Sequence, residues 1–257
     1  MRWTIGALGL GGLLGCAPQP GDCAAEGGGE PAPGAAIVEL RTPDGVCLFA
    51  EVDGAGGAGP GVVLVHPSTP SVGRGSWPRG FVGALQAEGF RVLRFDRRGA
   101  GRSGAGAAGA GAAAADVEAA RGWFAGQGGG PVALLGAEDG TVGVLDVGAA
   151  PVGEAPAALV FLSGGPGTEA NHPVEAVAGM PVRFVTGAAD PSWARTRAAV
   201  DPSFSLDERG TDAVGIGLLS GDPAAGPAIA QWLAAAVQAG AGGGSDSGSF
   251  DTGITRR

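Results

Sequence analysis

Four short runs of apolar residues recur through the middle of the chain and constrain its fold more than any other feature. They are Val62–Val65, Val132–Leu135, Leu159–Leu162 and Val182–Val185. A strand that is apolar on both faces has to be covered on both faces. Because these runs do not alternate with polar residues, they favour a buried parallel sheet over a sheet with one face in water.

Stretches with helical character separate these runs. The segment 116–124 begins with aspartate, a good N-cap residue, and places Val117, Ala120 and Phe124 on one face of a helix. Alternating strands and helices predict the α/β fold class, with a mostly parallel central sheet and helices on both of its faces. The other predicted elements are an opening hairpin of Ile37–Arg41 and Val46–Val52, strands at Val62–His66, 90–96, Val132–Leu135, 158–163 and 182–187, and helices at Phe81–Glu88, Thr141–Ala149 and Ala224–Val237.

The glycine and proline content sets the expected domain boundaries. The chain has 257 residues, which suits one domain with a substantial core. Its 53 glycines and 19 prolines would suggest low complexity, but the apolar residues are gathered in dense runs. We therefore expect a flexible tether over 16–35, one α/β domain over 36–238 and a disordered tail over 239–257.

Charge and metal-ligand patterns exclude several function classes. The formal net charge is -9, and all 16 basic residues are arginine without a basic stripe, so we expect no nucleic-acid partner. Glu138 and Asp139 are adjacent carboxylates, but no His/Cys cluster accompanies them. We expect no metal and no cofactor.

The first residues have the pattern of a cleaved export signal. Arg2 provides a positive start, and Ile5–Leu14 is an apolar stretch too short to span a bilayer. The following Leu13-Leu14-Gly15-Cys16 resembles a bacterial lipobox. The resemblance implies that residues 1–15 are removed and that Cys16 becomes a lipidated N-terminus, which would anchor the protein to the bacterial membrane in the cell envelope, on its periplasmic side or at the cell surface. A plain signal peptide with an incidental cysteine is the alternative.

Two further cysteines would then lie in an oxidising compartment. Cys23 falls in the expected tether and Cys47 in the opening hairpin. A disulfide between them and a pair of separate thiols are equally compatible with the sequence, because the sequence gives no geometry.

The segment Gly136-Ala137-Glu138-Asp139-Gly140 has the spacing of a nucleophile elbow, G-x-Nuc-x-G, with glutamate in the central position. From about residue 36 to 238 the chain resembles the α/β-hydrolase superfamily, particularly small serine hydrolases with an aminopeptidase- or esterase-like core and no large lid. Four segments carry the resemblance: "VVLVHPST" at 62–69, "GFRVLRFDRRGAGRSG" at 89–104, "VALLGAEDG" at 132–140 and "VRFVTGAADP" at 182–191.

The resemblance implies roles for particular residues. Asp190 matches the acid of the catalytic triad, and the backbone N–H of Asp139 together with the loop at Ser68 matches the oxyanion hole. Glu138 stands where the nucleophilic serine belongs. Val214-Gly215 stands where the family has His-Gly, and no histidine occurs after His172.

Two function classes remain open. The first is a non-catalytic scaffold that binds a small molecule or a protein, because the positions of the nucleophile and the base are both substituted. The second is a hydrolase of esters or peptides with displaced catalytic groups, or with Glu138 as a covalent nucleophile like the aspartate of haloalkane dehalogenases and epoxide hydrolases. Those enzymes still need a histidine to activate water.

Other polar residues have structural interpretations. We expect His66 to brace the oxyanion loop by hydrogen bonding and His172 to be a solvated loop residue, although each is also a candidate replacement base. Asp96, Arg97 and Ser103 are expected to fix the turn around Gly99–Gly101.

The remaining candidates are a small-residue run and the tryptophans. The run 104–115 is expected to be a loosely ordered connector, with a lid as the alternative. The tryptophans are candidates for lining a pocket, although Trp123 and Trp232 fall on core-facing helix positions; the set comprises Trp77, Trp123, Trp193 and Trp232.

Overall fold

A central sheet of eight strands organises the computed structural model, which describes residues 33–108, 110–128, 130–164, 172–188 and 192–242. Cys16, Cys23 and Asp190 lie outside the described residues. The order across the sheet is β1-β2-β4-β3-β5-β6-β7-β8; β1/β2 and β2/β4 pair antiparallel and every other neighbouring pair is parallel. The strands are β1 (Ala35–Arg41), β2 (Cys47–Asp53), β3 (Gly61–Val65), β4 (Arg91–Phe95), β5 (Val132–Ala137), β6 (Ala158–Leu162), β7 (Val182–Thr186) and β8 (Phe204–Glu208).

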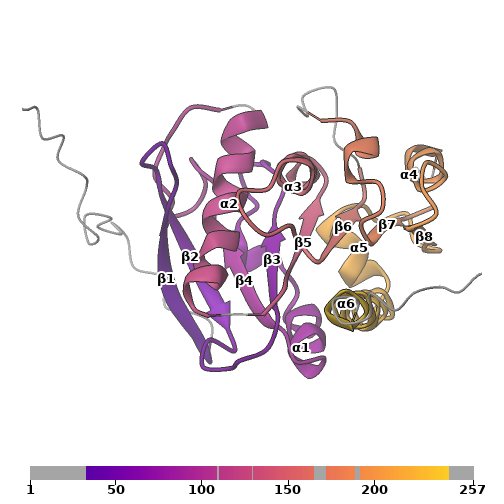
Figure 1. The fold of residues 1–257 in the computed structure, drawn as a ribbon, viewed down its shortest axis with the longest axis horizontal. Helices are drawn as coiled ribbons and strands as arrows, with labels where there is room; N and C mark the ends of the chain where they lie inside the picture. Colours follow the sequence, from indigo (N-terminus) through magenta and orange to yellow (C-terminus); the bar gives the residue numbers. More distant parts are fainter. Residues whose placement is uncertain (1–32, 109, 129, 165–171, 189–191, 243–257) are drawn as a thin grey trace, which may run out of the picture.

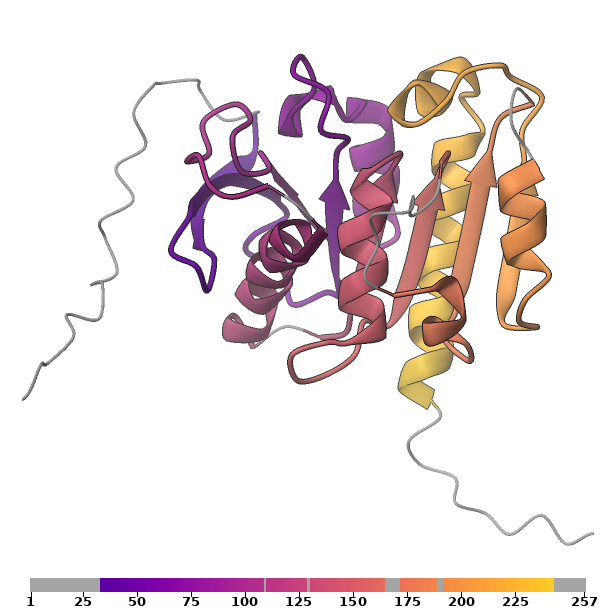
Figure 2. The same cartoon turned by 90° about the horizontal axis from the view of Figure 1, so that it is seen from above.

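Helices cover both faces of this sheet (Figure 1). α2 and α3 pack against each other on one face, and α1 and α6 pack together on the other. Figure 2 shows the same layers from above, with α2 and α3 in front of the strands and α6 behind them. The helices are α1 (Arg79–Ala87), α2 (Ala110–Gly126), α3 (Gly140–Ala149), α4 (Ser192–Ala198), α5 (Ile216–Gly221) and α6 (Ala225–Gly242), with 3-10 turns η1 (Arg74–Ser76) and η2 (Val174–Val177).

The core is divided by the sheet into two apolar clusters. On the α2/α3 side, Val117, Ala120 and Phe124 are fully buried, as the helical pattern of 116–124 predicts. On the opposite side, α1 and α6 contribute Phe81 and Leu233. The α/β class, the mostly parallel sheet and the helices on both faces are confirmed.

Two expectations about element boundaries were wrong, and three elements were not predicted. α2 begins at Ala110, so the second half of the run 104–115 is helical, which agrees with the high helix propensity of alanine. The closing helix continues to Gly242, past residue 239, where the tail was expected to begin. The sequence pattern also missed β8, α4 and α5.

The opening hairpin forms as predicted, and the described tryptophans pack in the core. The opening hairpin turns at Gly45, which has a φ of 86°. Trp77 is 2 % exposed and packs in the core, so it does not line a pocket, while Trp123 and Trp232 pack against the two core clusters. The side chain of Trp193 is not among those described.

The parallel strands place the functional candidates along one edge. The carboxyl ends of β3, β4, β5 and β6 lead into the loops that carry His66, Asp96, Glu138 and Ser163. Open α/β sheets bind ligands at this edge of the strands. Within the described part of the chain, no helix is long and apolar enough to cross a membrane.

Candidate functional site at the carboxyl edge of the sheet

The elbow is formed as the glycine spacing predicts. β5 ends at Ala137, α3 begins at Gly140, and Glu138 between them has a φ of 51°, a left-handed conformation that is unusual for a residue with a side chain. A Cβ at Gly136 would lie 2.8 Å from the carbonyl carbon of Gly140, and a Cβ at Gly140 would lie 2.5 Å from the carbonyl oxygen of Val65. The two glycines are therefore required by the close approach of strand, turn and helix.

The side chain of Glu138 lies over the loop where the family's histidine is expected. A Cβ added to Gly215 would stand 2.0 Å from Glu138 Oε1, so the carboxylate occupies the space directly beside this glycine. The neighbouring Val214 is 50 % exposed and has no group that can accept a proton. Glu138 is half-buried, and its carboxylate has no hydrogen bond or ion pair with any described residue.

Asp139 fills the expected oxyanion site with its own carboxylate. The backbone N–H of Ser68 donates to Asp139 Oδ1 at 2.8 Å, and the Ser68 hydroxyl donates to Oδ2. The Arg97 guanidinium adds an ion pair at 3.2 Å. Ser68 and Asp139 thus meet as the resemblance implies, but the Ser68 N–H that would stabilise a substrate oxyanion is already occupied by an anion.

The ionisation of Asp139 follows from these contacts. Partial burial acts to raise the pKa of Asp139, but the hydrogen bonds from the Ser68 hydroxyl and backbone, with the Arg97 charge, outweigh it and lower the pKa below its ordinary value. Asp139 is therefore an anion at neutral pH. Since like charges repel, this carboxylate opposes development of a second negative charge at Ser68.

Ser163 is a part of this edge that the sequence reasoning did not single out. It follows β6, has a φ of 46°, and accepts the Glu138 N–H on its carbonyl oxygen at 2.9 Å. Within the described residues, Glu138 and Ser163 are the only non-glycine residues with positive φ. Ser163 is 5 % exposed, and its hydroxyl has no hydrogen-bond partner among the described residues. The sequence feature that could have pointed to Ser163 is the Ser163-Gly164 pair directly after a buried strand.

His66 braces the oxyanion loop, as expected. Its ring is buried; Nδ1 donates to the Pro67 carbonyl at 2.7 Å, and Nε2 accepts the Arg97 N–H at 3.1 Å. Burial lowers the pKa of His66, so the imidazole is neutral. Both ring nitrogens are engaged in main-chain contacts, which leaves neither available as a catalytic base.

The turn after β4 is fixed by the residues predicted for it. Asp96 accepts the backbone N–H groups of Arg74 and Arg102 at 2.9 and 3.0 Å. Ser103 donates to the Asp96 carbonyl and accepts the Phe49 N–H at 2.9 Å. Arg97 joins the turn to the elbow through its contacts with the His66 carbonyl and Asp139.

His172 does not reach the elbow. Its Nδ1 lies 3.2 Å from Asp146 Oδ1, and its side chain is 38 % exposed. Asp146 is seven residues after Asp139 on the same helix, which corresponds to about 10 Å along the axis. His172 is thus a partly solvated partner of a buried carboxylate. The described residues hold no cluster of His, Cys, Asp and Glu that would bind a metal ion.

A hollow of about 300 Å³ borders this edge. Ser68 and Arg97 form one wall, the glycine-rich turn 99–101 forms another, and α2 contributes Ala112 and Ala113. Ser68, which binds Asp139 of the elbow, thus also borders this hollow.

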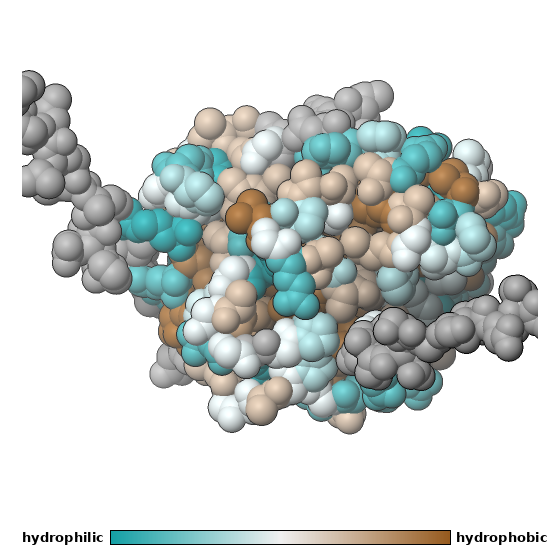
Figure 3. Space-filling view, viewed as in Figure 1, coloured by the Kyte–Doolittle hydropathy of each residue, from teal (hydrophilic) through white to brown (hydrophobic). Residues whose placement is uncertain are grey.

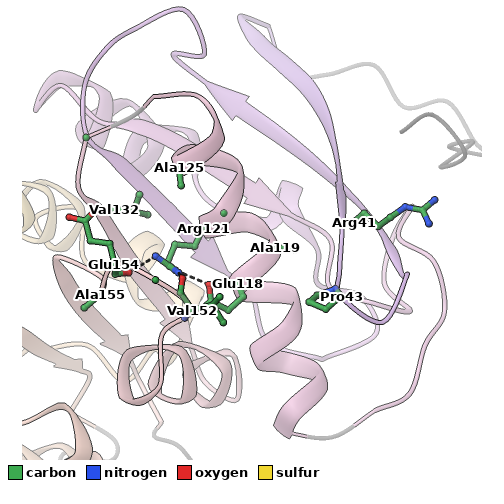
Figure 4. A pocket seen from close by; sticks show the side chains of 13 residues that line it. Arg41, Pro43, Glu118, Ala119, Arg121, Ala125, Val132, Val152, Glu154 and Ala155 are labelled. Atoms are coloured by element: carbon green, nitrogen blue, oxygen red, sulfur yellow. Dashed lines mark hydrogen bonds and ion pairs between the residues drawn. The ribbon is translucent and has the colours of Figure 1, made fainter. Parts of the chain in front are cut away.

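A second and larger hollow lies at the opposite edge of the sheet. Its volume is about 380 Å³, between α2 and the loop before β6 (Figure 4). Arg121 crosses it and bonds Glu118 at 2.8 Å, the Glu154 carbonyl at 2.6 Å and the Val152 carbonyl. Figure 4 shows the Arg41 guanidinium directed away from this group.

The described residues on the face shown in Figure 3 form no single apolar patch. Brown, apolar spots are separated by teal and pale residues on the face shown in Figure 3. Among the described residues, the large apolar side chains that are exposed come from separate segments: Ile37, Val152, Val200 and Val214.

Comparison with known proteins shows the fold. No model of a known protein family and no curated protein matches the chain. Among solved structures, an esterase of Pyrococcus furiosus is 17 % identical, with a TM-score of 0.65 over 80 % of this chain and 93 % of its own. An enol-lactonase from Burkholderia xenovorans is 15 % identical, with a TM-score of 0.62 over 76 % and 99 %. The chain has an α/β-hydrolase fold.

A third similar structure is not a hydrolase by name. The bottromycin epimerase BotH, in complex with bottromycin A2, is 21 % identical, with a TM-score of 0.58 over 76 % of this chain and 98 % of its own. The fold alone is therefore compatible with more than one activity, and the function has to be argued from the residues at the elbow.

Proposed function

We propose that the protein is a membrane-anchored lipoprotein of the bacterial cell envelope whose α/β-hydrolase-like domain binds a small molecule or a protein without hydrolysing it. The anchor is the lipid-modified Cys16, proposed from the Leu-Leu-Gly-Cys pattern. The binding site is the carboxyl edge of the sheet around Glu138.

One observation carries the non-catalytic role: the elbow presents two carboxylates where a serine hydrolase needs a hydroxyl and free N–H donors. Glu138 replaces the hydroxyl, and Asp139 accepts the Ser68 N–H that would bind the oxyanion. Removing even one oxyanion donor from a working enzyme costs about 10²–10³ in rate. With the base position held by Val214, three parts of the machinery are lost together.

The same edge keeps groups that a ligand can engage. The Glu138 carboxylate and the buried Ser163 hydroxyl have no hydrogen-bond partners among the described residues. A buried polar group such as the Ser163 hydroxyl is nearly always satisfied in folded proteins, and exceptions point to a water, an ion or a functional contact. These two groups lie at the ends of neighbouring strands and are joined by the Glu138 N–H to Ser163 carbonyl bond.

Labelling with a serine-reactive fluorophosphonate tests the absence of an activated nucleophile. The full chain should remain unlabelled under conditions that label a working serine hydrolase. Labelling that disappears in Ser163→Ala would contradict the proposal, because it would identify Ser163 as a displaced nucleophile.

Membrane fractionation tests the anchor. Cys16→Ser should release the protein from the membrane fraction or block its processing. Unchanged membrane association of the variant, with an unmodified mature N-terminus in the wild type, would overturn the anchoring.

A second candidate is a hydrolase that uses Glu138 as its nucleophile. The observation in its favour is the retained elbow conformation of Glu138, with a φ of 51° and a carboxylate that no described residue engages. Its weakness is the missing water-activating histidine, since His66 is engaged and His172 pairs with Asp146.

A further inference from the structure

Cys47 lies at the same edge of the sheet as the elbow. It is the first residue of β2, and β2 runs antiparallel to β4, so the start of β2 adjoins the carboxyl end of β4. The Cys47 carbonyl accepts the Gly104 N–H at 2.8 Å. This contact fastens Cys47 to the turn 99–104, part of which lines the hollow beside Ser68 and Arg97.

The sulfur of Cys47 is part of a disulfide, and its partner lies outside the described residues. The chain contains 3 cysteines, so within one chain the partner is Cys16 or Cys23. Both alternatives join the N-terminal segment covalently to the functional edge of the domain.

We infer that the partner is Cys23 and that the disulfide holds the elbow edge toward the membrane. The inference rests on the proposed lipidation of Cys16, because a sulfur that carries a lipid has no thiol left for a disulfide. Formation of the Cys23–Cys47 bond removes two protons and two electrons from two thiols. The electrons pass to a disulfide oxidant of the cell envelope, whose own disulfide becomes a dithiol.

The disulfide would shorten the chain that connects the lipid anchor to the site. A fully extended chain from Cys16 to Cys23 spans at most about 25 Å, whereas one from Cys16 to the start of β1 spans up to about 65 Å. With the disulfide closed, the shorter length limits the distance of Cys47 from the membrane surface. The site is therefore presented to molecules at the membrane surface, and the 152–155 loop at the opposite edge of the sheet is turned away from it.

Mapping the disulfide in the mature full chain tests the pairing. Trypsin leaves Cys16 and Cys23 in one peptide, so a protease that cleaves before Asp22 is needed to separate them. Non-reducing mass spectrometry should find Cys23 linked to Cys47 and lipid on Cys16. A Cys16–Cys47 link would overturn the lipoprotein proposal as well as this inference. Lipid on Cys16 with Cys47 free, or linked to another copy, would overturn this inference alone.

Fluorescence quenching tests the orientation. A fluorescent amino acid is placed at the exposed Ala105, beside Gly104, or at the 77 % exposed Val152, as the matched control at the opposite edge. On phosphatidylglycerol vesicles with a lipid-linked quencher, Ala105 should be quenched more strongly than Val152. The difference should shrink in Cys23→Ser and Cys47→Ser, provided that melting curves show both variants folded. Equal quenching at the two positions in the disulfide-linked protein would contradict the orientation.

Discussion

Two polar groups at opposite edges of the sheet, one around Arg121 and one around Glu138 and Ser163, differ in how fully their hydrogen bonds are made. At the amino edge, the larger hollow is crossed by Arg121, and all three of its side-chain nitrogens have partners. At the carboxyl edge, Glu138 and Ser163 adopt left-handed conformations, and no described residue hydrogen-bonds to the Ser163 hydroxyl or the Glu138 carboxylate. The group around Arg121 is a closed network, whereas the Glu138 carboxylate and the Ser163 hydroxyl have hydrogen-bonding capacity left for a ligand.

This difference shows why cavity size is a poor guide to the site here. Strained backbone and unsatisfied polar groups cost stability, and they persist where the surrounding structure enforces them. An ion pair such as Arg121–Glu118, whose groups already have partners, leaves no free hydrogen-bonding group for a ligand. The following predictions test this contrast.

The largest effect is expected at Gly140. Gly140→Ala puts a Cβ 2.5 Å from the Val65 carbonyl oxygen, a backbone atom that cannot move away cheaply. The free energy of unfolding, measured in urea, should fall by about 3 kcal/mol. The matched control is Gly122→Ala on α2, where no atom lies within 4 Å of the added Cβ; it should gain up to about 1 kcal/mol. Equal effects would show that the elbow packs loosely.

At the amino edge, Arg121→Met should be the most damaging change. It removes the donor of two carbonyls and one of the two donors of the partly buried Glu118 carboxylate, so the free energy of unfolding should fall by about 2 kcal/mol. Arg195→Met is the control, because its ion pair with Glu208 is exposed to solvent and its loss should leave the free energy of unfolding nearly unchanged. A neutral Arg121→Met would remove the contrast between the edges.

Relief of strain at Glu138 should give a smaller effect of opposite sign. Glycine adopts a φ of 51° freely, and the left-handed conformation costs other residues about 1–2 kcal/mol. After the extra chain entropy of glycine, Glu138→Gly should gain about 0.5 kcal/mol. Glu88→Gly, at a φ of -84°, should instead lose stability. If both variants lose stability equally, Glu138 is not strained.

The smallest change is a pH dependence caused by His66. Its folded pKa is lowered by burial, so below the unfolded value of about 6.5 the unfolded chain binds a proton that the folded chain does not. Stability should therefore be fully present above about pH 6.5 and should fall on acidification from there toward the folded pKa. The melting temperature between about pH 7 and pH 5 should fall in the wild type and in His172→Gln, and this slope should flatten in His66→Gln.

The fold was predictable because short local sequence patterns indicate which segments form the central strands and where the chain turns between them. Short uninterrupted apolar runs such as Val62–Val65 favour central strands, and the spacing of Gly136 and Gly140 predicts the elbow. β8 was missed because its sequence, "FSLDE", is short and half polar, as an edge strand is.

The contacts that decide the function were not predictable in the same way. Asp139 and Ser68 are 71 residues apart, and only the folded loop shows that the carboxylate occupies the N–H donor. Ser163 gives no local signal beyond a glycine after a strand. Its importance depends on the Glu138 N–H that it accepts across the strand ends.

Hydrolysis of p-nitrophenyl acetate by the full chain, compared with Glu138→Gln, tests whether the elbow is catalytic. Both proteins should release nitrophenol at the rate of buffer alone, and Glu138→Ser should do no better, because Val214 provides no base and Asp139 occupies the Ser68 N–H. Wild-type turnover that Glu138→Gln abolishes would instead make Glu138 the nucleophile or base of an active hydrolase.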